Sequence, residues 1–316
     1  ADVLPFWVAD MDFEIPPELK QILLDRVKHG VFGYTESDDE YFGVLKNWFA
    51  TRFNWTPEQK WLVKTPGIVF ALAMAVRAFT EVGEGVLINQ PVYYPFSMVI
   101  DDNDRRLINV PLIKGDEKYT IDFERIERAI IEENVTLFLL CNPHNPVGHV
   151  WTLEEMDRLF SICQQHKVLI ISDEIHQDLI TGLTPFTSAL TVSNGAYTDK
   201  LIAMSSLSKS FNMASLHHAE VIIPNEELRN HYNAFKALVY HTDSDVLSEA
   251  ASTAAYTHPE AEAWLTDLLA VVKENYDYMC NKLHATLPEL RISPMDGTYL
   301  AWIDFSAYLK PEEMHD

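Results

Sequence analysis

The sequence has little cysteine, little positive charge and no long apolar run. Its three cysteines, Cys141, Cys163 and Cys280, are widely spaced and odd in number, which argues against a disulfide framework. Lysine and arginine total 24 against 47 aspartate and glutamate residues, and the net charge of -23 argues against binding to nucleic acid or to an anionic membrane surface. No run reaches the ~18–20 apolar residues of a membrane span, and the first residues lack the basic and apolar regions of a signal peptide. We therefore expect a soluble, cytoplasmic protein, and we assign no metal site.

Short apolar runs alternate with amphipathic segments along most of the 316 residues. Runs typical of strands are Val86–Ile88, Leu107–Leu112, Val135–Cys141, Val168–Ser172, Leu201–Met204, Val221–Ile223 and Thr298–Phe305. Patterns typical of helices are Glu18–His29, Tyr41–Phe53, Phe70–Thr80, Phe123–Glu132, Thr152–His166 and Ala261–Leu283. This alternation predicts an α/β fold with a mostly parallel central sheet that is covered on both faces. We expect a large domain over residues 34–258 and a smaller α+β domain built from residues 1–33 and 259–316.

Polar side chains follow three of the predicted core strands. Asn145 comes after the run 135–141, Asp173 after 168–172, and Lys209 after 201–204. In open α/β sheets ligands bind beyond the carboxyl ends of the strands, so we expect these three groups to meet in one crevice. Gly67 opens a predicted helix, and the free N–H groups of such an end bind anions. The aromatic segment at residues 9–13 is expected to be a packed loop in which Asp10 or Asp12 caps a turn.

Lys209 suits two kinds of chemistry. With Ser206 it forms the pattern S-x-x-K, in which a lysine activates a serine nucleophile. That chemistry also needs elements like S-D-N and K-T-G, and the nearest stretches here, residues 193–195 and 64–66, do not match them. Lys209 could instead form a Schiff base with a carbonyl cofactor. The surrounding residues favour the cofactor.

Pyridoxal phosphate has needs that the residues around this crevice can meet. Its aldehyde needs a lysine, its ring nitrogen a carboxylate, its phenolic oxygen a donor, its phosphate an anion cradle and its ring face an aromatic group. The candidates, in that order, are Lys209, Asp173, Asn145, the helix start Gly67-Ile68-Val69 with Ser206, and Tyr93.

A series of motifs resembles the class I/II aminotransferase-fold pyridoxal-phosphate enzymes (fold type I), and within them the MalY/PatB group of cystathionine β-lyases. The motifs are Ala9-Asp10-Met11-Asp12-Phe13, Phe32-Gly33-Tyr34-Thr35, Gln90-Pro91-Val92-Tyr93, Asn142-Pro143-His144-Asn145-Pro146-Val147-Gly148, Ser172-Asp173-Glu174-Ile175-His176, Ser206-Leu207-Ser208-Lys209-Ser210-Phe211-Asn212 and Gly297-Thr298-Tyr299-Leu300.

The resemblance implies roles for individual residues. Lys209 would hold the cofactor and then remove the Cα proton of the substrate, while Tyr93 would stack on the ring. Asp173 would pair with the pyridinium, and Asn145, with His176 where many relatives carry tyrosine, would contact the phenolic oxygen. Residues assigned to the phosphate are the backbone of Ile68 and Val69, the hydroxyls of Ser206 and Ser208, and Tyr34 from the neighbouring subunit of a homodimer.

Three further implications follow from the resemblance. The peptide bond Asn145-Pro146 is expected to be cis. His217 occupies the position of a phosphate-binding arginine that is common in aminotransferases, which favours a lyase. The arginine that binds the substrate carboxylate is expected beyond residue 316.

Three functions remain open from the sequence. The first is β-elimination on a small sulfur amino acid, which yields pyruvate, ammonia and a thiol. The second is transamination, which uses the same residues. The third is a regulatory binding protein on the same fold, although Lys209, Asp173 and Asn145 together argue against a site without activity.

Overall fold

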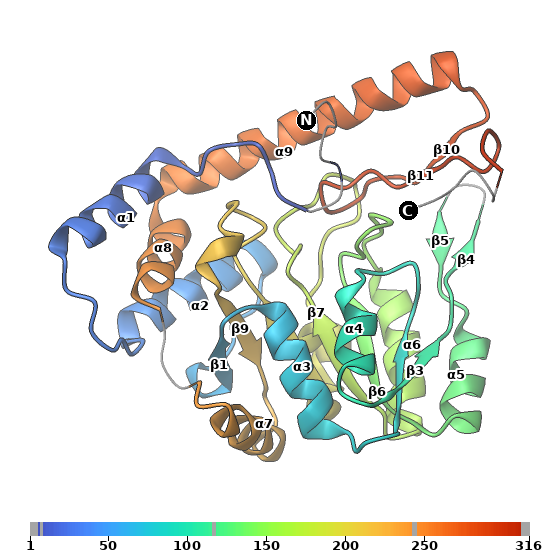
Figure 1. Ribbon diagram of the computed structural model, residues 1–316, viewed down its shortest axis with the longest axis horizontal. Coiled ribbons are helices and arrows are strands. Elements are labelled where there is room, and N and C mark those ends of the chain that lie inside the picture. Colours follow the sequence, from blue (N-terminus) through green and yellow to red (C-terminus); the bar gives the residue numbers. More distant parts are fainter. Residues whose placement is uncertain (1–5, 7–8, 116–117, 242–244, 311–316) are drawn as a thin grey trace.

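The computed structural model describes residues 6, 9–115, 118–241 and 245–310, and Figure 1 shows their arrangement. Residues 1–5, 7–8 and 311–316 of the predicted smaller domain lie outside this part. The helices are α1 (Pro17–His29), α2 (Asp39–Phe53), α3 (Ile68–Phe79), α4 (Pro95–Asp101), α5 (Phe123–Glu132), α6 (Leu153–Gln165), α7 (Glu226–Leu238), α8 (Val246–Thr257) and α9 (Pro259–Thr286). No helix among the described residues is both long enough and apolar enough to cross a membrane.

The main sheet has the strand order β1-β9-β8-β7-β6-β2-β3. Its strands are β1 (Leu62–Thr65), β2 (Gly85–Ile88), β3 (Arg106–Asn109), β6 (Val135–Cys141), β7 (Leu169–Asp173), β8 (Leu201–Ser205) and β9 (Ala219–Ile222). The five strands from β8 to β3 are parallel, and β9 and β1 continue the sheet in antiparallel pairing. Two hairpins, β4 (Ile113–Lys114) with β5 (Tyr119–Thr120) and β10 (Arg291–Ile292) with β11 (Ile303–Asp304), complete the described strands. The predicted α/β class and mostly parallel sheet are confirmed.

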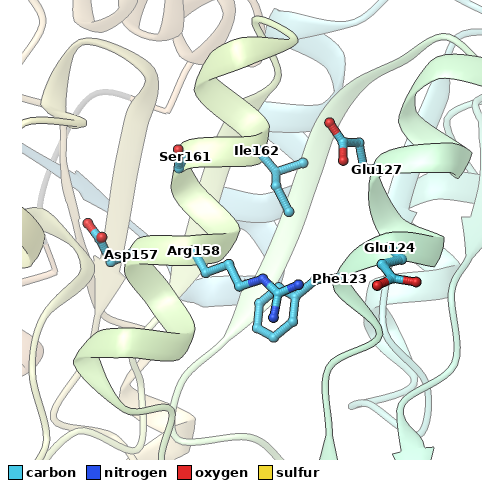
Figure 2. A pocket seen from close by; sticks show the side chains of 7 residues that line it. All are labelled: Phe123, Glu124, Glu127, Asp157, Arg158, Ser161 and Ile162. Atoms are coloured by element: carbon cyan, nitrogen blue, oxygen red, sulfur yellow. The ribbon is translucent and has the colours of Figure 1, made fainter.

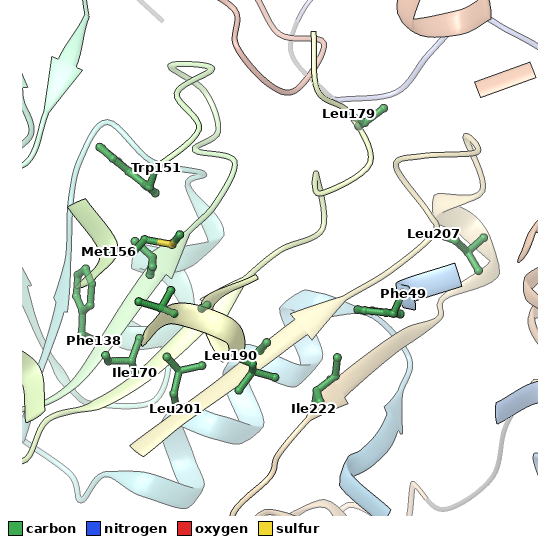
Figure 3. Close-up of a cluster of buried hydrophobic side chains, with 14 of the residues drawn as sticks. Phe49, Phe138, Trp151, Met156, Ile170, Leu179, Leu190, Leu201, Leu207 and Ile222 are labelled. Atoms are coloured by element: carbon green, nitrogen blue, oxygen red, sulfur yellow. The ribbon is translucent and has the colours of Figure 1, made fainter. Parts of the chain in front are cut away.

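The strands bury both of their faces. In β6 alternate side chains enter two separate cores: Phe138 packs with residues of α2, α5 and α6, while Leu137 packs with residues of α3, α4 and α7. Figure 3 shows part of the first core, in which Phe138 and Ile170 from adjacent strands lie near Met156 of α6. Because successive residues of a strand point to opposite faces, a sheet covered on both sides needs the unbroken apolar runs seen in this sequence.

Local signals placed most element boundaries correctly. Thr152 Oγ1 accepts a hydrogen bond from the Glu155 backbone N–H, and the Glu155 carboxylate accepts one from the Thr152 backbone N–H, so the predicted capping box at the start of α6 is confirmed. The predicted strand over 298–305 is wrong for most of its length, because only Ile303–Asp304 is extended in a ladder. Thr298 has a left-handed φ of 68°, which interrupts the extended run.

The division into two domains stays a prediction. The proposed boundary at residue 258 falls on His258, the residue that separates α8 from α9. In Figure 1 the long helix α9 lies across one end of the molecule, with α1 beside α8 near the beginning of α9.

Candidate active site

The carboxyl ends of three parallel strands lie side by side at the predicted crevice. Cys141 of β6 pairs with Asp173 of β7, and Asp173 pairs with Met204 of β8. The chain stays tied together as it leaves the strands, because the Asn142 N–H donates to the Asp173 carbonyl at 2.9 Å and the Glu174 N–H donates to the Met204 carbonyl at 2.8 Å. The register therefore places Asp173 between the segments that lead to Asn145 and Lys209.

Asp173 is a buried carboxylate with few partners. It is 3 % exposed, and its Oδ1 accepts a hydrogen bond from the Ile175 N–H at 3.1 Å. Burial raises the pKa of Asp173 to about 7, against the smaller opposing effects of the Ile175 N–H and the charge of Lys209. A further cation placed beside Asp173 would stabilise its ionised form.

Lys209 reaches the same place from the turn after β8. Burial lowers the pKa of its ammonium group, while the charges of Asp10 and then Asp173 oppose that effect. Its Nζ donates to the Ala9 carbonyl at 2.9 Å and lies 3.9 Å from Asp10 Oδ1. Asp10, expected only to cap a turn, is thus a neighbour of the lysine.

Histidine and tyrosine side chains line the space around Lys209. His176 is buried, and burial lowers its pKa to about 3, with a smaller contribution from Lys209, so the ring is neutral. Its Nδ1 is buried without a hydrogen-bond partner among the described residues. The His176 ring meets Tyr299 edge-on at 5.9 Å, and burial, with smaller effects that include Asp173 and Asp10, raises the pKa of Tyr93.

The structure also positions Asn145 and the predicted phosphate ligands. The Tyr93 N–H donates to the Asn145 carbonyl at 3.0 Å, and the predicted cis bond Asn145–Pro146 is confirmed. Two further cis bonds, Gln90–Pro91 and Asn142–Pro143, were not predicted. The serine hydroxyls are adjacent, with Ser206 Oγ 2.9 Å from Ser208 Oγ. Ser206 Oγ also donates to the His218 carbonyl at 2.6 Å and accepts from the Ser208 N–H at 3.1 Å.

The start of α3 has the geometry of an anion cradle. Gly67 precedes the helix with φ 124° and ψ 165°, a conformation that residues with a side chain rarely adopt. No side chain in the described part of the chain caps this end, so the N–H groups of Ile68 and Val69 stay available to a ligand. Ile68 is buried, whereas Val69 is 41 % exposed.

Tyr34 does not join these residues within its own chain. It is 97 % exposed, on the segment between α1 and α2. Its predicted role therefore depends on a second subunit.

Surface hollows do not identify the crevice. One of 320 Å³, shown in Figure 2, lies between α5 and α6 and contains none of the predicted site residues. There the Arg158 guanidinium lies over the Phe123 ring, 4.3 Å from its centroid. Another, of 300 Å³, is lined by Thr65, Pro66, His217 and His218 among others, which border Gly67 and Ser206. It lies beside the predicted phosphate end.

Sequence reasoning missed two groups at the crevice, the Ala9 carbonyl and the Tyr299 hydroxyl. Both Lys209 Nζ and Tyr299 Oη donate to that carbonyl, the latter at 2.6 Å. These contacts join residues 200 and 290 positions apart, so no spacing pattern could have indicated them. The signal that was present is the motif at residues 9–13, whose two carboxylates stand in an apolar segment.

Two features define a class of α/β enzymes that use a lysine-bound carbonyl cofactor. One is a carboxylate at the end of β7, with a lysine and an amide in the segments that follow the adjacent strands β8 and β6, and the other is a helix start that is free to bind an anion. The family model "Aminotransferase class I and II" matches residues 1–315. The chain belongs to this family.

Similar proteins include lyases. The cystathionine beta-lyase PatB of Bacillus subtilis is 37% identical over 310 residues, covering 97% of this chain and 79% of the relative. Protein MalY of Escherichia coli is 34% identical over 318 residues, covering 100% of this chain and 79% of the relative. Among solved structures, the PLP-bound C-S lyase from Staphylococcus hominis has a TM-score of 0.92 at 33% identity, covering 100% of this chain and 79% of that one.

Proposed function

We propose that this protein is a pyridoxal-phosphate-dependent carbon–sulfur lyase that acts on a small sulfur amino acid such as cystathionine. The observation that carries the proposal is the pair formed by Lys209 and Asp173, whose charged forms are both destabilised by burial. Asp173 ends β7, and Lys209 lies on the turn after the adjacent strand β8. PatB and the C-S lyase from Staphylococcus hominis support the reaction type.

The residues present fit the cofactor in two respects. Asp173 is buried with a raised pKa, so a cationic ring nitrogen beside it would restore the ionised carboxylate. His176 has a buried Nδ1 without a partner among the described residues, which a ligand atom could satisfy. Lys209, Asp173, Asn145, His176 and Tyr93 would hold the ring, and the start of α3 with Ser206 and Ser208 would hold the phosphate.

The protein residues then have distinct tasks. When bound, pyridoxal phosphate supplies an aldehyde for the lysine and an electron-withdrawing ring that acidifies the substrate Cα. Lys209 Nζ accepts the Cα proton, for which its neutral form is required, and burial favours that form. Delivery of the proton to the departing sulfur yields a thiol, and water hydrolyses the rest of the substrate to pyruvate and ammonia.

Transamination is the alternative, and the family description names that reaction. It needs the same residues and differs in where Lys209 returns the proton. An assay separates the two reactions.

The decisive assay offers cystathionine to the holoenzyme without a keto acid. Pyruvate released at a steady rate supports the lyase, and turnover that begins only after a keto acid is added overturns it in favour of transamination. Lys209→Ala is the control, because loss of the amine removes both the covalent link and the base. We expect that variant to lose the visible absorbance of the lysine-bound cofactor and more than ~10³-fold of the activity.

We also propose a homodimer with Tyr34 at the phosphate of the partner subunit. Tyr34 is 97 % exposed, and its neighbours Val31 and Phe32 are 61 % and 56 % exposed, an apolar segment suited to an interface. Sedimentation at assay concentrations tests this part of the proposal. A fully active monomer would contradict it.

A further inference from the structure

The segment Ala9–Phe13 is fastened across the crevice by side chains from distant parts of the chain. At one end the Ala9 carbonyl accepts hydrogen bonds from Lys209 Nζ and Tyr299 Oη. At the other, Asn212 Nδ2 donates to the Met11 and Phe13 carbonyls, both at 2.8 Å, and Asn212 Oδ1 accepts from the Met11 N–H at 3.3 Å. Asp10 lies between these two attachments, so its backbone is held from both sides.

That position puts a carboxylate beside the amine of the catalytic lysine. Asp10 Oδ1 is 3.9 Å from Lys209 Nζ, and the side chain of Asp10 is 65 % exposed while that of Lys209 is 16 % exposed. The Ala9 carbonyl is 2.9 Å from the same Nζ. One acceptor and one negative charge from adjacent residues thus face the atom that must take up a proton.

We propose that Ala9 and Asp10 stabilise the ammonium form of Lys209, Ala9 through its carbonyl and Asp10 through its negative charge. Asp10 is then a positioning residue that makes the lysine a stronger base. This inference rests on the proposed function. In the step concerned, the Cα–H bond breaks and an N–H bond forms at Lys209 Nζ, which becomes an ammonium group 3.9 Å from the carboxylate. The electrons of the C–H bond end in the Cα–Cβ double bond, the C–S pair leaves with sulfur, and Nζ gives its proton to that sulfur.

The other charged or titratable groups around Lys209 do not duplicate this role. Asp173, at the end of β7, also favours the ammonium, but it is the buried group proposed to pair with the cofactor ring. His176, which follows β7, is neutral. Tyr299 shares the Ala9 carbonyl and is a neutral donor, since burial raises its pKa. Asp10 is therefore the carboxylate that stays beside the Lys209 amine, without another assigned partner, throughout the reaction.

The first test measures Lys209 in the full chain freed of cofactor. Trace acetylation with acetic anhydride at one fixed pH reports the neutral fraction of each lysine, quantified by peptide mass spectrometry against the exposed Lys46. Loss of a partly exposed ion pair should raise acetylation of Lys209 in Asp10→Asn about two- to fivefold at low salt. The increase should shrink at high salt, because exposed charges are screened.

Asp12→Asn is the matched control, since it removes one exposed carboxylate from the same segment. It should leave Lys209 acetylation unchanged. Equal labelling of Lys209 in the wild type and Asp10→Asn, or the same increase in both variants, would overturn the proposal.

The second test measures turnover by the holoenzyme. A weaker base transfers protons more slowly, so kcat of Asp10→Asn should fall about two- to tenfold with little change in KM. The two readouts then move in opposite directions, faster labelling and slower turnover. A loosened fold would also speed the labelling of Lys64, whose side chain is 14 % exposed, and that labelling should not change. Faster labelling with unchanged kcat would overturn the role in proton transfer. A wild type without lyase activity would refute the proposed function instead, and the labelling comparison would still report on the pair of Asp10 and Lys209.

Discussion

Two regions of this molecule bury a carboxylate, and they differ in the hydrogen-bonding and charged partners that surround it. In the β1–β9 network, formed by Tyr41, Lys64, His218, Glu220 and Glu249, the buried carboxylate has close partners. Glu220 Oε1 accepts hydrogen bonds from the Tyr41 hydroxyl and from His218 Nε2, and Lys64 stands opposite Glu220 in the strand register. In the crevice, the Asp173 carboxylate accepts one hydrogen bond from the residues that the structure describes, donated by the Ile175 N–H, and it interacts with the charge of Lys209.

The pKa values record this difference. Burial alone would raise the pKa of Glu220, but the charge of His218 and the hydrogen bonds from His218 and Tyr41 hold it below its ordinary value. The pKa of Asp173 rises to about 7 because burial outweighs its partners. Removing one partner from a buried, hydrogen-bonded ion pair destabilises the fold, whereas a buried carboxylate without enough compensation is the mark of a place that binds something else.

The largest effect is expected when the network is broken. Glu220→Gln removes the anionic acceptor of the buried hydrogen bonds from Tyr41 and His218, so the free energy of unfolding should fall by about 3–5 kcal/mol, although Lys64 keeps Glu249 as a partner. Urea unfolding followed by circular dichroism measures it. Glu133→Gln is the control, because Glu133 pairs with Arg106 at the surface, with the two side chains 48 % and 47 % exposed, and should cost at most about 1 kcal/mol. Similar losses in the two variants would show that the network is not a special source of stability.

This network was not predicted from the sequence, for a physical reason that also limits the site. Strands, helix starts and the Thr152 cap depend on neighbouring residues, and for that reason Asp173 and Lys209 could be assigned to strand ends in advance. The contacts of Tyr41 with Glu220 and of Ala9 with Lys209 join residues 179 and 200 positions apart, and only the finished fold brings them together. The roles assigned to the cofactor-binding residues stay predictions.

Replacement of Asp173, the carboxylate in the crevice, should raise the free energy of unfolding rather than lower it. A pKa raised from 3.8 to about 7 means that the folded protein holds a proton that the unfolded chain has lost, so the contribution of Asp173 to stability declines as pH rises from about 4 to 7. The raised pKa corresponds to about 4 kcal/mol, partly offset by desolvation of the new amide. Cofactor-free Asp173→Asn should therefore exceed the wild type by roughly 2–3 kcal/mol at pH 8 and match it near pH 4.

Urea unfolding at the two pH values checks this expectation. Glu174, whose pKa burial raises to about 7 with a smaller contribution from the charge of Asp173, is kept in both proteins, so the difference reports Asp173 and its coupling to Glu174. The same variant should bind pyridoxal phosphate at least ~10-fold more weakly, as followed by visible absorbance, because the ring nitrogen loses its anion. A variant that is less stable at pH 8 than the wild type would remove the contrast between the two regions.

The smallest effect on stability is expected from two glycines that differ in backbone conformation. Gly67 and Gly43 both have open space where a Cβ would lie, but Gly67 has φ 124° and Gly43 lies within α2. Gly67→Ala should cost about 1–2 kcal/mol, because an alanine strains that backbone, and it should weaken cofactor binding by disturbing the start of α3. Gly43→Ala should add about 0.5–1 kcal/mol of helix stability and leave binding unchanged. One added methyl group should thus change stability in opposite directions at two uncrowded positions. Thermal unfolding and cofactor titration measure the two effects. If both variants were equally stable and bound the cofactor equally well, the conformation of Gly67 would not be what keeps the start of α3 open to an anion.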